Sequence, residues 1–294
     1  MGKNLRNLSA YAEDSGLARG VFHMNDTIFE LKDVHFSYLG KFSALSGIDI
    51  NIKQGEKITV VGANGSGKST LLHMLDGLIF PDKGEISVLG RQLRQDDFNN
   101  DEFSNNFRRT IGFVFQNPDV QLFCPTVKED ILFGPLQLGI GKDEIHKRLE
   151  ELVNALDIKD LLGRSPHQLS LGEKRKVAIA STLIIGPDVL LLDEPTAGLD
   201  PLTTRHIIDL LIRANASGKT IITSTHDLHI VEEISDIVYV FSQEKRIAGF
   251  GHPQQILKDD QLLRDNNLIH IHRHKHRDVV HEHPHQHLEH HHES

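Results

Sequence analysis

The sequence predicts an α/β fold with a parallel sheet built around a phosphate-binding loop. Residues 62–69 read GANGSGKS and fit the pattern G-x-x-x-x-G-K-[ST]. They lie between an apolar run at 58–61, typical of a buried parallel strand, and a helical pattern at 69–78. A second apolar run, 189–192, ends in two adjacent carboxylates, Asp193 and Glu194. Ligands of such sheets bind beyond the carboxyl ends of the strands, so we expect both segments to belong to one site.

The glycine loop and the two carboxylates carry the groups that nucleotide chemistry needs. Glycines let backbone N–H groups turn toward a phosphate, and the helix N-terminus adds positive partial charge. Lys68 supplies a charge toward the β- and γ-phosphates, and the Ser69 hydroxyl is placed for Mg²⁺. We expect Asp193 to hold Mg²⁺, through water, and Glu194 to polarise the attacking water.

The remaining elements follow from hydrophobic periodicity. Early strands are expected at 28–36 and 48–52, and further core strands at 111–115, 220–224 and 237–241. Between Pro125 and Gly186 the pattern is helical, and 142–156 has apolar residues at spacings of three and four, which predicts a separate helical lobe. The polar run at 99–106 is expected to be a loop.

Five further segments stand in a fixed order around these two motifs. They are FSY at 36–38, FVFQ at 113–116, LSLGE at 169–173, GLD at 198–200 and TIITSTH at 220–226. This set resembles the nucleotide-binding domain of ABC ATPases, over about residues 27–263. The resemblance implies a P-loop NTPase core of ABC type with an antiparallel β subdomain and an inserted helical subdomain. It also implies ATP hydrolysis with Mg²⁺.

The resemblance assigns roles residue by residue. Tyr38 would stack on adenine, Gln116 would touch Mg²⁺ and the lytic water, and His226 would contact the γ-phosphate. Glu194, His226 and Gln116 are thus the expected catalytic residues, and Ser69, Gln116 and Asp193 the expected Mg²⁺ residues. The expected ATP-binding residues are Tyr38, Gly62, Asn64, Gly65, Ser66, Gly67, Lys68, Ser69, Thr70, Ser170 and Gly172.

The signature segment at 169–173 implies a second subunit. Ser170 and Gly172 would close over the γ-phosphate bound by another chain, and Asp200 would lie in the loop that communicates across the dimer. This segment departs from the commonest signature, LSGGQ, because Leu171 replaces a glycine and Glu173 replaces a glutamine. Since Ser170 and Gly172 remain, the phosphate contact can remain.

The residues around Gln116 carry a narrower resemblance. QNPDVQLF at 116–123 and VKEDILFGP at 127–135 are similar to the ATPases of energy-coupling-factor importers, which serve vitamins, cobalt and nickel. The resemblance implies a second ATPase subunit, identical or closely related, with a membrane coupling subunit and a substrate-binding membrane subunit. It places the chain peripherally at the cytoplasmic face of the cell membrane.

Composition agrees with this interpretation. A formal net charge of -9 argues against nucleic-acid binding, and the single cysteine, Cys124, excludes an internal disulfide. No apolar run approaches the roughly 18–20 residues that span a bilayer. The expected organisation is an N-terminal extension at 1–26, expected to be mobile, an ATP-binding domain at 27–265 with its helical subdomain at about 117–187, and a tail at 266–294. Met24 is an alternative start of the chain.

The tail is rich in histidine, with 11 of these residues between 270 and 294. Imidazole clusters bind Ni²⁺, Co²⁺, Cu²⁺ or Zn²⁺, and we expect a flexible binder with several modes. The alternating histidines are His270, His272, His274, His276, His281, His283, His285 and His287. Two alternatives are a solvated tract without a role and, for LEHHH at 288–292, a purification tag.

The function expected from these features is ATP hydrolysis that powers import of cobalt or nickel through a separate membrane subunit, with the tail as the feature that favours metal. Three alternatives stay open. They are a vitamin-importing energy-coupling-factor transporter, a soluble ABC ATPase without a transport role, and a metal-buffering protein.

Overall fold

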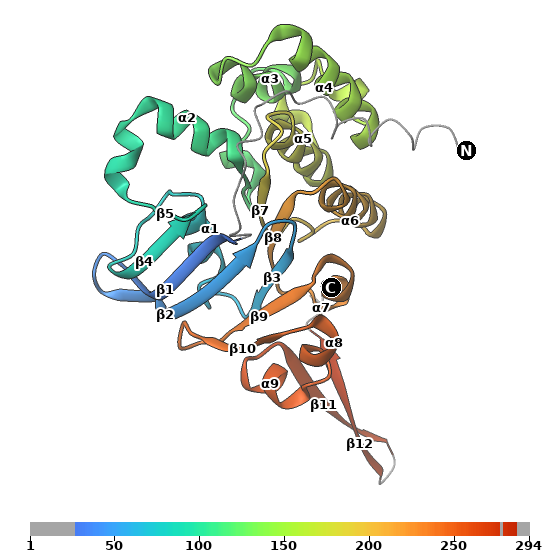
Figure 1. Ribbon diagram of the computed structural model, residues 1–294. Coiled ribbons are helices and arrows are strands. Elements are labelled where there is room, and N and C mark those ends of the chain that lie inside the picture. The colour runs from blue at the N-terminus through green and yellow to red at the C-terminus, as the bar shows by residue number, and fades with distance from the viewer. Residues whose placement is uncertain (1–26, 277–278, 287–294) are drawn as a thin grey trace.

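The computed structural model describes residues 27–276 and 279–286 (Figure 1). The expected N-terminal extension at 1–26, the alternative start at Met24, and His287 with the residues after it lie outside the described residues. In the described ranges, no helix is long and apolar enough to cross a membrane.

A six-stranded sheet in the order β10-β9-β3-β8-β7-β6 forms the centre of the molecule. Neighbouring strands from β9 to β6 are parallel, and β10 pairs antiparallel at one edge. The strands are β3 (Lys57–Gly62), β6 (Ile111–Val114), β7 (Val189–Asp193), β8 (Thr220–Thr225), β9 (Ile237–Phe241) and β10 (Ile247–Gly251). The α/β prediction is confirmed, and the continuous apolar runs form strands because both faces are covered.

A second, antiparallel sheet has the order β2-β1-β4-β5. Its strands are β1 (Thr27–Tyr38), β2 (Phe42–Lys53), β4 (Lys83–Val88) and β5 (Arg91–Gln92). Phe29, Leu31 and Ile48 on its inner face pack in one cluster with Leu71 and Leu75 of α1 (Lys68–Leu75). The helix that follows the glycine loop is therefore held between the two sheets.

The segment between β6 and β7 is helical. It contains η3 (Pro118–Val120), α3 (Val127–Gln137), α4 (Lys142–Leu156), η4 (Lys159–Leu161), η5 (Pro166–Gln168) and α5 (Leu171–Leu183). The predicted helix at 142–156 is α4, whose Ile145, Leu149 and Leu152 are buried. These side chains share a core with Val177 of α5 and Leu190 of β7, so the helices pack on the central sheet as well as on one another.

One predicted loop is a helix. The run at 99–106, expected to be a loop, contributes to η2 (Gln95–Asn99) and to α2 (Asp101–Thr110). The Asn100 side chain caps α2 by accepting a hydrogen bond from the N–H of Phe103, and Asp101 and Glu102 suit the first turn. Phe107 is buried in the core cluster, and Phe103 packs against it. The prediction was wrong because it weighted polarity above the cap and the two phenylalanines one turn apart.

The chain after β8 returns along the outer edge of the sheet. It forms α7 (Leu228–Ile234), β9 and β10, then α8 (Pro253–Ile256), α9 (Asp260–Asp265) and a hairpin of β11 (Ile269–His276) and β12 (Val279–Gln286). Before β8, α6 (Pro201–Ala216) connects it to β7. Leu268 and Ile269 are buried in a cluster with Val240 of β9. Thus the histidine-rich segment, expected to be flexible, is a hairpin that begins in the core.

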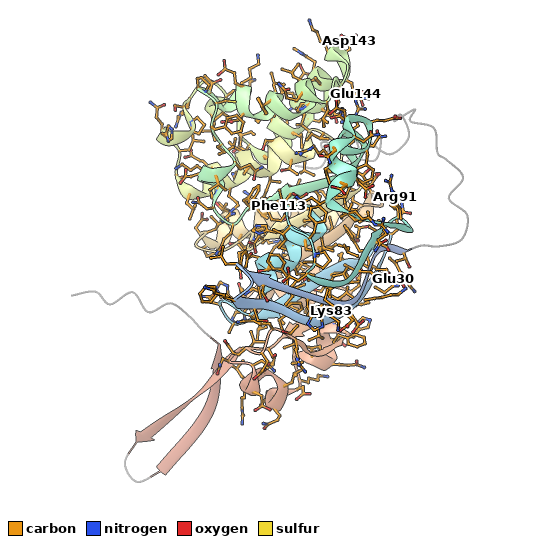
Figure 2. All side chains as sticks on the ribbon, turned by 90° about the vertical axis from the view of Figure 1, so that its left-hand side faces the viewer. Glu30, Lys83, Arg91, Phe113, Asp143 and Glu144 are labelled. Atoms are coloured by element: carbon orange, nitrogen blue, oxygen red, sulfur yellow. The ribbon has the colours of Figure 1, made fainter. Side chains whose placement is uncertain are left out.

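The hairpin and the helical lobe lie at opposite ends of the molecule. In Figure 1 the hairpin extends downward, away from the sheets, and α3 and α4 lie at the top. Figure 2, turned by 90°, shows the same separation between the hairpin and the end of α4 that carries Asp143 and Glu144.

Candidate nucleotide-binding and catalytic site

The glycine loop connects β3 to α1 in a conformation that depends on glycine. Gly67 has φ +111° at the helix start, and a Cβ there would lie 2.4 Å from the carbonyl oxygen of Ala44. Gly65 has φ +77°, and a Cβ built on it would meet nothing within 4 Å. The loop is thus packed against β2 at Gly67 and open at Gly65, where the predicted phosphate would enter.

Lys68 is the first residue of α1 and is buried, with 6% of its surface exposed. Its Nζ donates to the Gly62 carbonyl oxygen at 2.7 Å and lies 3.6 Å from Oε1 of Glu194. Burial lowers the pKa of Lys68, and the charges of Glu194 and Asp193 oppose that shift. The ammonium group is therefore held between the glycine loop and the predicted catalytic carboxylate.

The loop also contains a buried polar atom without a partner. Ser66 is 1% exposed, and its Oγ has no hydrogen-bond partner among the described residues. A buried hydroxyl left unpaired is costly, so this atom fits a site completed by a ligand oxygen. Ser69 is half-buried and Thr70 is buried, while Asn64 is exposed at the loop tip. The residues present fit a triphosphate.

The two carboxylates end β7, and β8 positions both. Asp193 pairs with Ser224 in the strand register, and the Ser224 hydroxyl donates to Oδ1 of Asp193. The N–H of Glu194 lies 3.1 Å from the Ser224 carbonyl oxygen, and Glu194 has φ +47°, which turns the chain out of the sheet. Asp193 and Glu194 are 3% and 4% exposed, so both carboxylates are removed from bulk water.

His226 follows β8 directly and completes a row of three ionisable groups. Its Nδ1 lies 2.9 Å from Oε2 of Glu194, whose Oε1 faces Lys68. The hydrogen bond to Glu194 raises the pKa of His226, although partial burial opposes the shift. Lys68, Glu194 and His226 come from three segments of the chain, and the parallel sheet brings them together at one edge.

Tyr38 lies beside the helix that carries the phosphate-binding residues. Its hydroxyl oxygen is 3.3 Å from Oγ1 of Thr70, and its ring packs edge-on against Phe36 with centroids 5.0 Å apart. The side chain is 42% exposed. A face of the ring is therefore available to a planar base next to the glycine loop.

Gln116 is exposed just after β6, and the loop that follows it is fastened to α5. Gln121 Nε2 lies 2.9 Å from the carbonyl oxygen of Ala178 and 3.1 Å from Oγ1 of Thr182. Arg175 of α5, 2% exposed, donates to the carbonyl oxygen of Phe115 at 2.8 Å. Burial lowers the pKa of Arg175, and the charges of Asp193 and Glu194 oppose that shift. The loop that carries Gln116 is thus attached to the helix that begins at the signature.

Ser170 and Gly172 lie at the start of α5. The Ser170 hydroxyl donates to Oε2 of Glu173 at 2.8 Å, and the N–H of Glu173 points back at Ser170 Oγ at 3.3 Å. In this reciprocal cap, Oε2 of Glu173 accepts hydrogen bonds from both the N–H and the hydroxyl of Ser170. These hydrogen bonds lower the pKa of Glu173. A Cβ on Gly172 would contact Thr203 of α6 at 3.4 Å.

The predicted site residues fall into two groups. Lys68, Glu194 and His226 are joined by hydrogen bonds and an ion pair. In the part of the chain that the structure describes, no hydrogen bond or ion pair links Ser170, Gly172 or Gln116 to that row. Asp200 caps α6 by accepting hydrogen bonds from the N–H groups of Leu202 and Thr203, so it has a structural role within one chain.

Three residues at the site were not predicted as members of it. Ser224 Oγ links the Asp193 carboxylate to the backbone N–H of Glu194, Arg175 ties α5 to the loop after β6, and Lys245 Nζ donates to the Gly65 carbonyl oxygen. A signal existed for Ser224, which is a hydroxyl residue near the carboxyl end of β8, two positions before His226. An arginine at a position of α5 that packs inward was a second signal. Nothing local marks Lys245, which is 180 residues from its partner.

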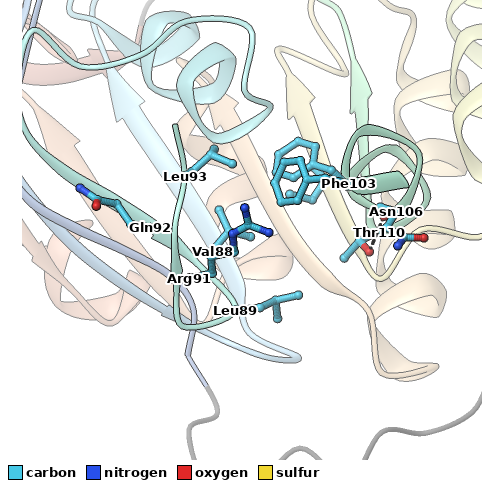
Figure 3. Close-up of a pocket in the computed structure, with 10 residues that line it drawn as sticks. Val88, Leu89, Arg91, Gln92, Leu93, Phe103, Asn106 and Thr110 are labelled. Atoms are coloured by element: carbon cyan, nitrogen blue, oxygen red, sulfur yellow. Dashed lines mark hydrogen bonds between the residues drawn. The ribbon is translucent and has the colours of Figure 1, made fainter. Parts of the chain in front are cut away.

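A hollow of about 250 Å³ lies apart from these residues, between β4–β5 and α2 (Figure 3). Its lining is mostly apolar and includes Val88, Leu93 and Phe107, and Arg91 stacks over the ring of Phe103 at 4.5 Å. None of the predicted nucleotide residues lines it. The hollow is a gap between the antiparallel sheet and α2 rather than part of the nucleotide site.

A glycine loop at the end of one parallel strand, and carboxylates and a histidine on the next strands, define a P-loop nucleoside triphosphatase. The family model described as ABC transporter matches residues 45–197. The nickel import ATP-binding protein NikO of Rhodobacter capsulatus is 47% identical over 244 residues, 82% of this chain and 95% of that protein. The chain belongs to the ABC transporter family of ATP-binding subunits, and it is an ATPase.

Two further comparisons agree with the energy-coupling-factor resemblance. The energy-coupling factor transporter ATP-binding protein EcfA of Methanocaldococcus jannaschii is 44% identical over 241 residues, 82% of this chain and 85% of that protein. The structure of CbiO1 from Clostridium perfringens, part of the ABC transporter complex CbiONQ, matches with a TM-score of 0.70 and 37% identity. It covers 83% of this chain and 96% of that one. The ABC fold prediction is confirmed.

Proposed function

We propose that this ATPase powers the import of nickel or cobalt through a separate membrane subunit, at the cytoplasmic face of the membrane. The observation that carries the ATP-dependent part is the row Lys68–Glu194–His226 beside the open glycine loop. The metal cargo is supported by the relative named for nickel import and by the histidine-rich hairpin. A vitamin-importing energy-coupling-factor transporter is the alternative, supported by the EcfA relative.

The residues of this chain suit in-line attack of water on the γ-phosphate. The open loop at Gly65 and the N-terminus of α1 receive the phosphates. The Lys68 ammonium group then exchanges its ion pair with Glu194 for contacts with the phosphates. Glu194 Oε2 then accepts the proton of the attacking water, while His226, bonded to that carboxylate, holds its orientation. ADP leaves as the bond to the γ-phosphorus breaks, and phosphate departs separately.

The oxygen donors near the loop fit Mg²⁺. Ser69, Asp193 and Gln116 are the residues that would hold it, and hard oxygen ligands of this kind suit that ion. When bound, Mg²⁺ would neutralise charge on the β- and γ-phosphates. Asp193 is kept in place for this task by the Ser224 hydroxyl.

A complete site needs two chains. Each chain has one glycine loop and one signature, and the described residues give no link between them within the chain. Leu171, next to Ser170, is 45% exposed, and Leu202, next to the Asp200 cap, is 66% exposed. We infer that this surface meets the glycine loop of a second, identical or closely related subunit, so that Ser170 and Gly172 serve the partner's ATP.

An exposed aromatic pair supports a membrane partner. Phe123 and Phe133 are 65% and 43% exposed, and their rings pack edge-to-face at 5.0 Å. The backbone before α3 is held rigid, because Oδ1 of buried Asp130 accepts from the N–H groups of Phe123 and Cys124. Phe123 lies on the loop that follows Gln116 and Phe133 lies on α3, so a partner seated on this pair would be coupled to the site through Gln121 and Arg175.

Uptake by cells tests the proposal. The chain would be expressed with the membrane subunits of a nickel or cobalt importer in cells that lack nickel and cobalt uptake. We expect radioactive nickel or cobalt to accumulate with the native chain and not with Lys68→Ala. Phe123→Asp should abolish uptake and keep basal ATPase activity, whereas Phe250→Asp, at an exposed aromatic on β10, should leave uptake intact. Accumulation of a vitamin and of neither metal would overturn the cargo.

A further inference from the structure

The hairpin of β11 and β12 arranges the histidines in a way the sequence did not show. The antiparallel register pairs His270 with His285, His272 with His283, and His274 with His281. Successive pairs step by two residues along each strand, so all six positions share one face of the hairpin. We call these six residues the histidine ladder.

The opposite face of the hairpin has a different character. Its pairs are Ile269 with Gln286, Ile271 with Pro284, Arg273 with Glu282, and Lys275 with Val280. No histidine falls on that face within the described strands. Alternation along each strand and the register between the strands thus place six of the seven histidines of the two strands opposite another histidine, and the seventh, His276, pairs with Val279 on the same face.

We propose that the histidine ladder is a binding site for divalent transition metals in which each cross-strand pair supplies two ligands to one ion. Directly paired residues of antiparallel strands have Cα atoms about 4.5–5.5 Å apart, which suits two imidazoles on one ion. Imidazole ligands favour Cu²⁺, Ni²⁺, Co²⁺ and Zn²⁺ over Mg²⁺. Among residues whose side chains the structure describes, no group of three or more His, Cys, Asp or Glu could hold a metal.

The hairpin is suited to this role by its attachment. Leu268 and Ile269 are buried in the cluster that contains Val240, so β11 starts from the ATPase core. Neighbouring pairs of the ladder lie about 7 Å apart along the strands. Two dications at that spacing repel each other, so the first ion binds most tightly and later ions bind progressively more weakly. The site goes beyond the proposed transport function, because it exists whatever cargo is carried.

Two double variants with equal composition separate the ladder from a featureless histidine tract. His272→Gln with His283→Gln removes both members of one pair and leaves two pairs intact. His272→Gln with His281→Gln also removes one histidine from each strand, but it breaks two pairs and leaves one. Calorimetric titration of the full chain with Ni²⁺, without nucleotide, should give about three ions for the native chain, two for the same-pair variant and one for the cross-pair variant.

Control variants and a check of folding accompany the titrations. His291→Gln with His292→Gln, outside the hairpin, should keep the ions of the ladder, and circular dichroism checks that each variant keeps the native fold. The single variants His272→Gln and His283→Gln should each weaken one ion at least tenfold, and the same-pair double should lose no further ion. Equal losses in the same-pair and cross-pair doubles would overturn the ladder, as would absence of Ni²⁺ binding by the native chain. Neither result would depend on whether metal is imported.

Discussion

Glu194→Gln is the sharpest test of the proposed chemistry, because it removes one charge at nearly constant shape. Glu194 lies 3.6 Å from Lys68 Nζ and 2.9 Å from His226 Nδ1. Turnover should fall by about two or more orders of magnitude, since the variant has no proton acceptor for the attacking water. An amide retains the hydrogen-bonding positions, so the glycine loop should still receive ATP.

The same substitution should tighten ATP binding. At 3.6 Å, with an effective dielectric of about 20, the attraction between Lys68 and Glu194 is about 4–5 kcal/mol before desolvation is counted. ATP must take the place of Glu194 beside Lys68, so part of this attraction opposes binding in the native chain. If a third of it persists after solvation changes, the variant gains about 1.4 kcal/mol, or roughly a tenfold lower Kd.

Two measurements on one preparation test the predicted loss of turnover and the predicted tighter ATP binding. Phosphate release gives the turnover rate, and titration with a fluorescent ATP analogue gives the Kd. Glu232→Gln, the same chemical change at an exposed position of α7, is the matched control and should alter neither value. Turnover within threefold of the native rate would refute the role of Glu194 as the base. An unchanged or weaker Kd would refute the competition for Lys68.

Three other predictions follow from the described contacts. Ser170→Arg and Lys68→Ala should each abolish turnover, yet mixed subunits should regain about one working site per dimer; activity that stays absent in the mixture would exclude the shared site. Burial raises the pKa of Asp76 to about 7, so ionisation destabilises the fold as pH rises from about 4 to about 8. The free energy of unfolding of Asp76→Asn, measured with urea at each pH, should rise by about 2 kcal/mol relative to the native chain across that range, a value that allows for the partial exposure of Asp76. Parallel pH profiles of the two proteins would contradict this. Gln121→Ala should lower the free energy of unfolding by about 1 kcal/mol, because it removes the hydrogen bonds from the Gln121 amide to α5, and an unchanged Tm would contradict that contribution.

Most of the sheet could be predicted because its signals are local. The runs at 58–61 and 189–192 are continuous and apolar, and strands covered on both faces need that composition. The same holds for α4, where apolar spacing alone placed the helix at Lys142–Leu156. Segments whose partners are far away in sequence were harder, since α2 depends on Phe107 reaching the core cluster.

The site residues likewise differ in whether a local sequence pattern predicts them. Motif spacing located Lys68, Glu194 and His226, because each ends or follows a strand of recognisable pattern. It could not locate Arg175 or Lys245, whose roles arise from contacts 60 and 180 residues away. The histidine ladder is the clearest case: the sequence showed alternation within each strand, but only the register shows which histidines face one another.

The position of the hairpin bears on when its histidines could meet a metal ion. The aromatic pair that we assign to the membrane partner belongs to the helical lobe, and the hairpin projects from the opposite end of the ATPase body. With the lobe seated on a membrane subunit, the hairpin extends into the cytoplasm. Under the proposed function, the ladder would therefore sample ions that are already inside the cell. Under that proposal, its occupancy would record metal already delivered, and the hairpin would act after the transport step.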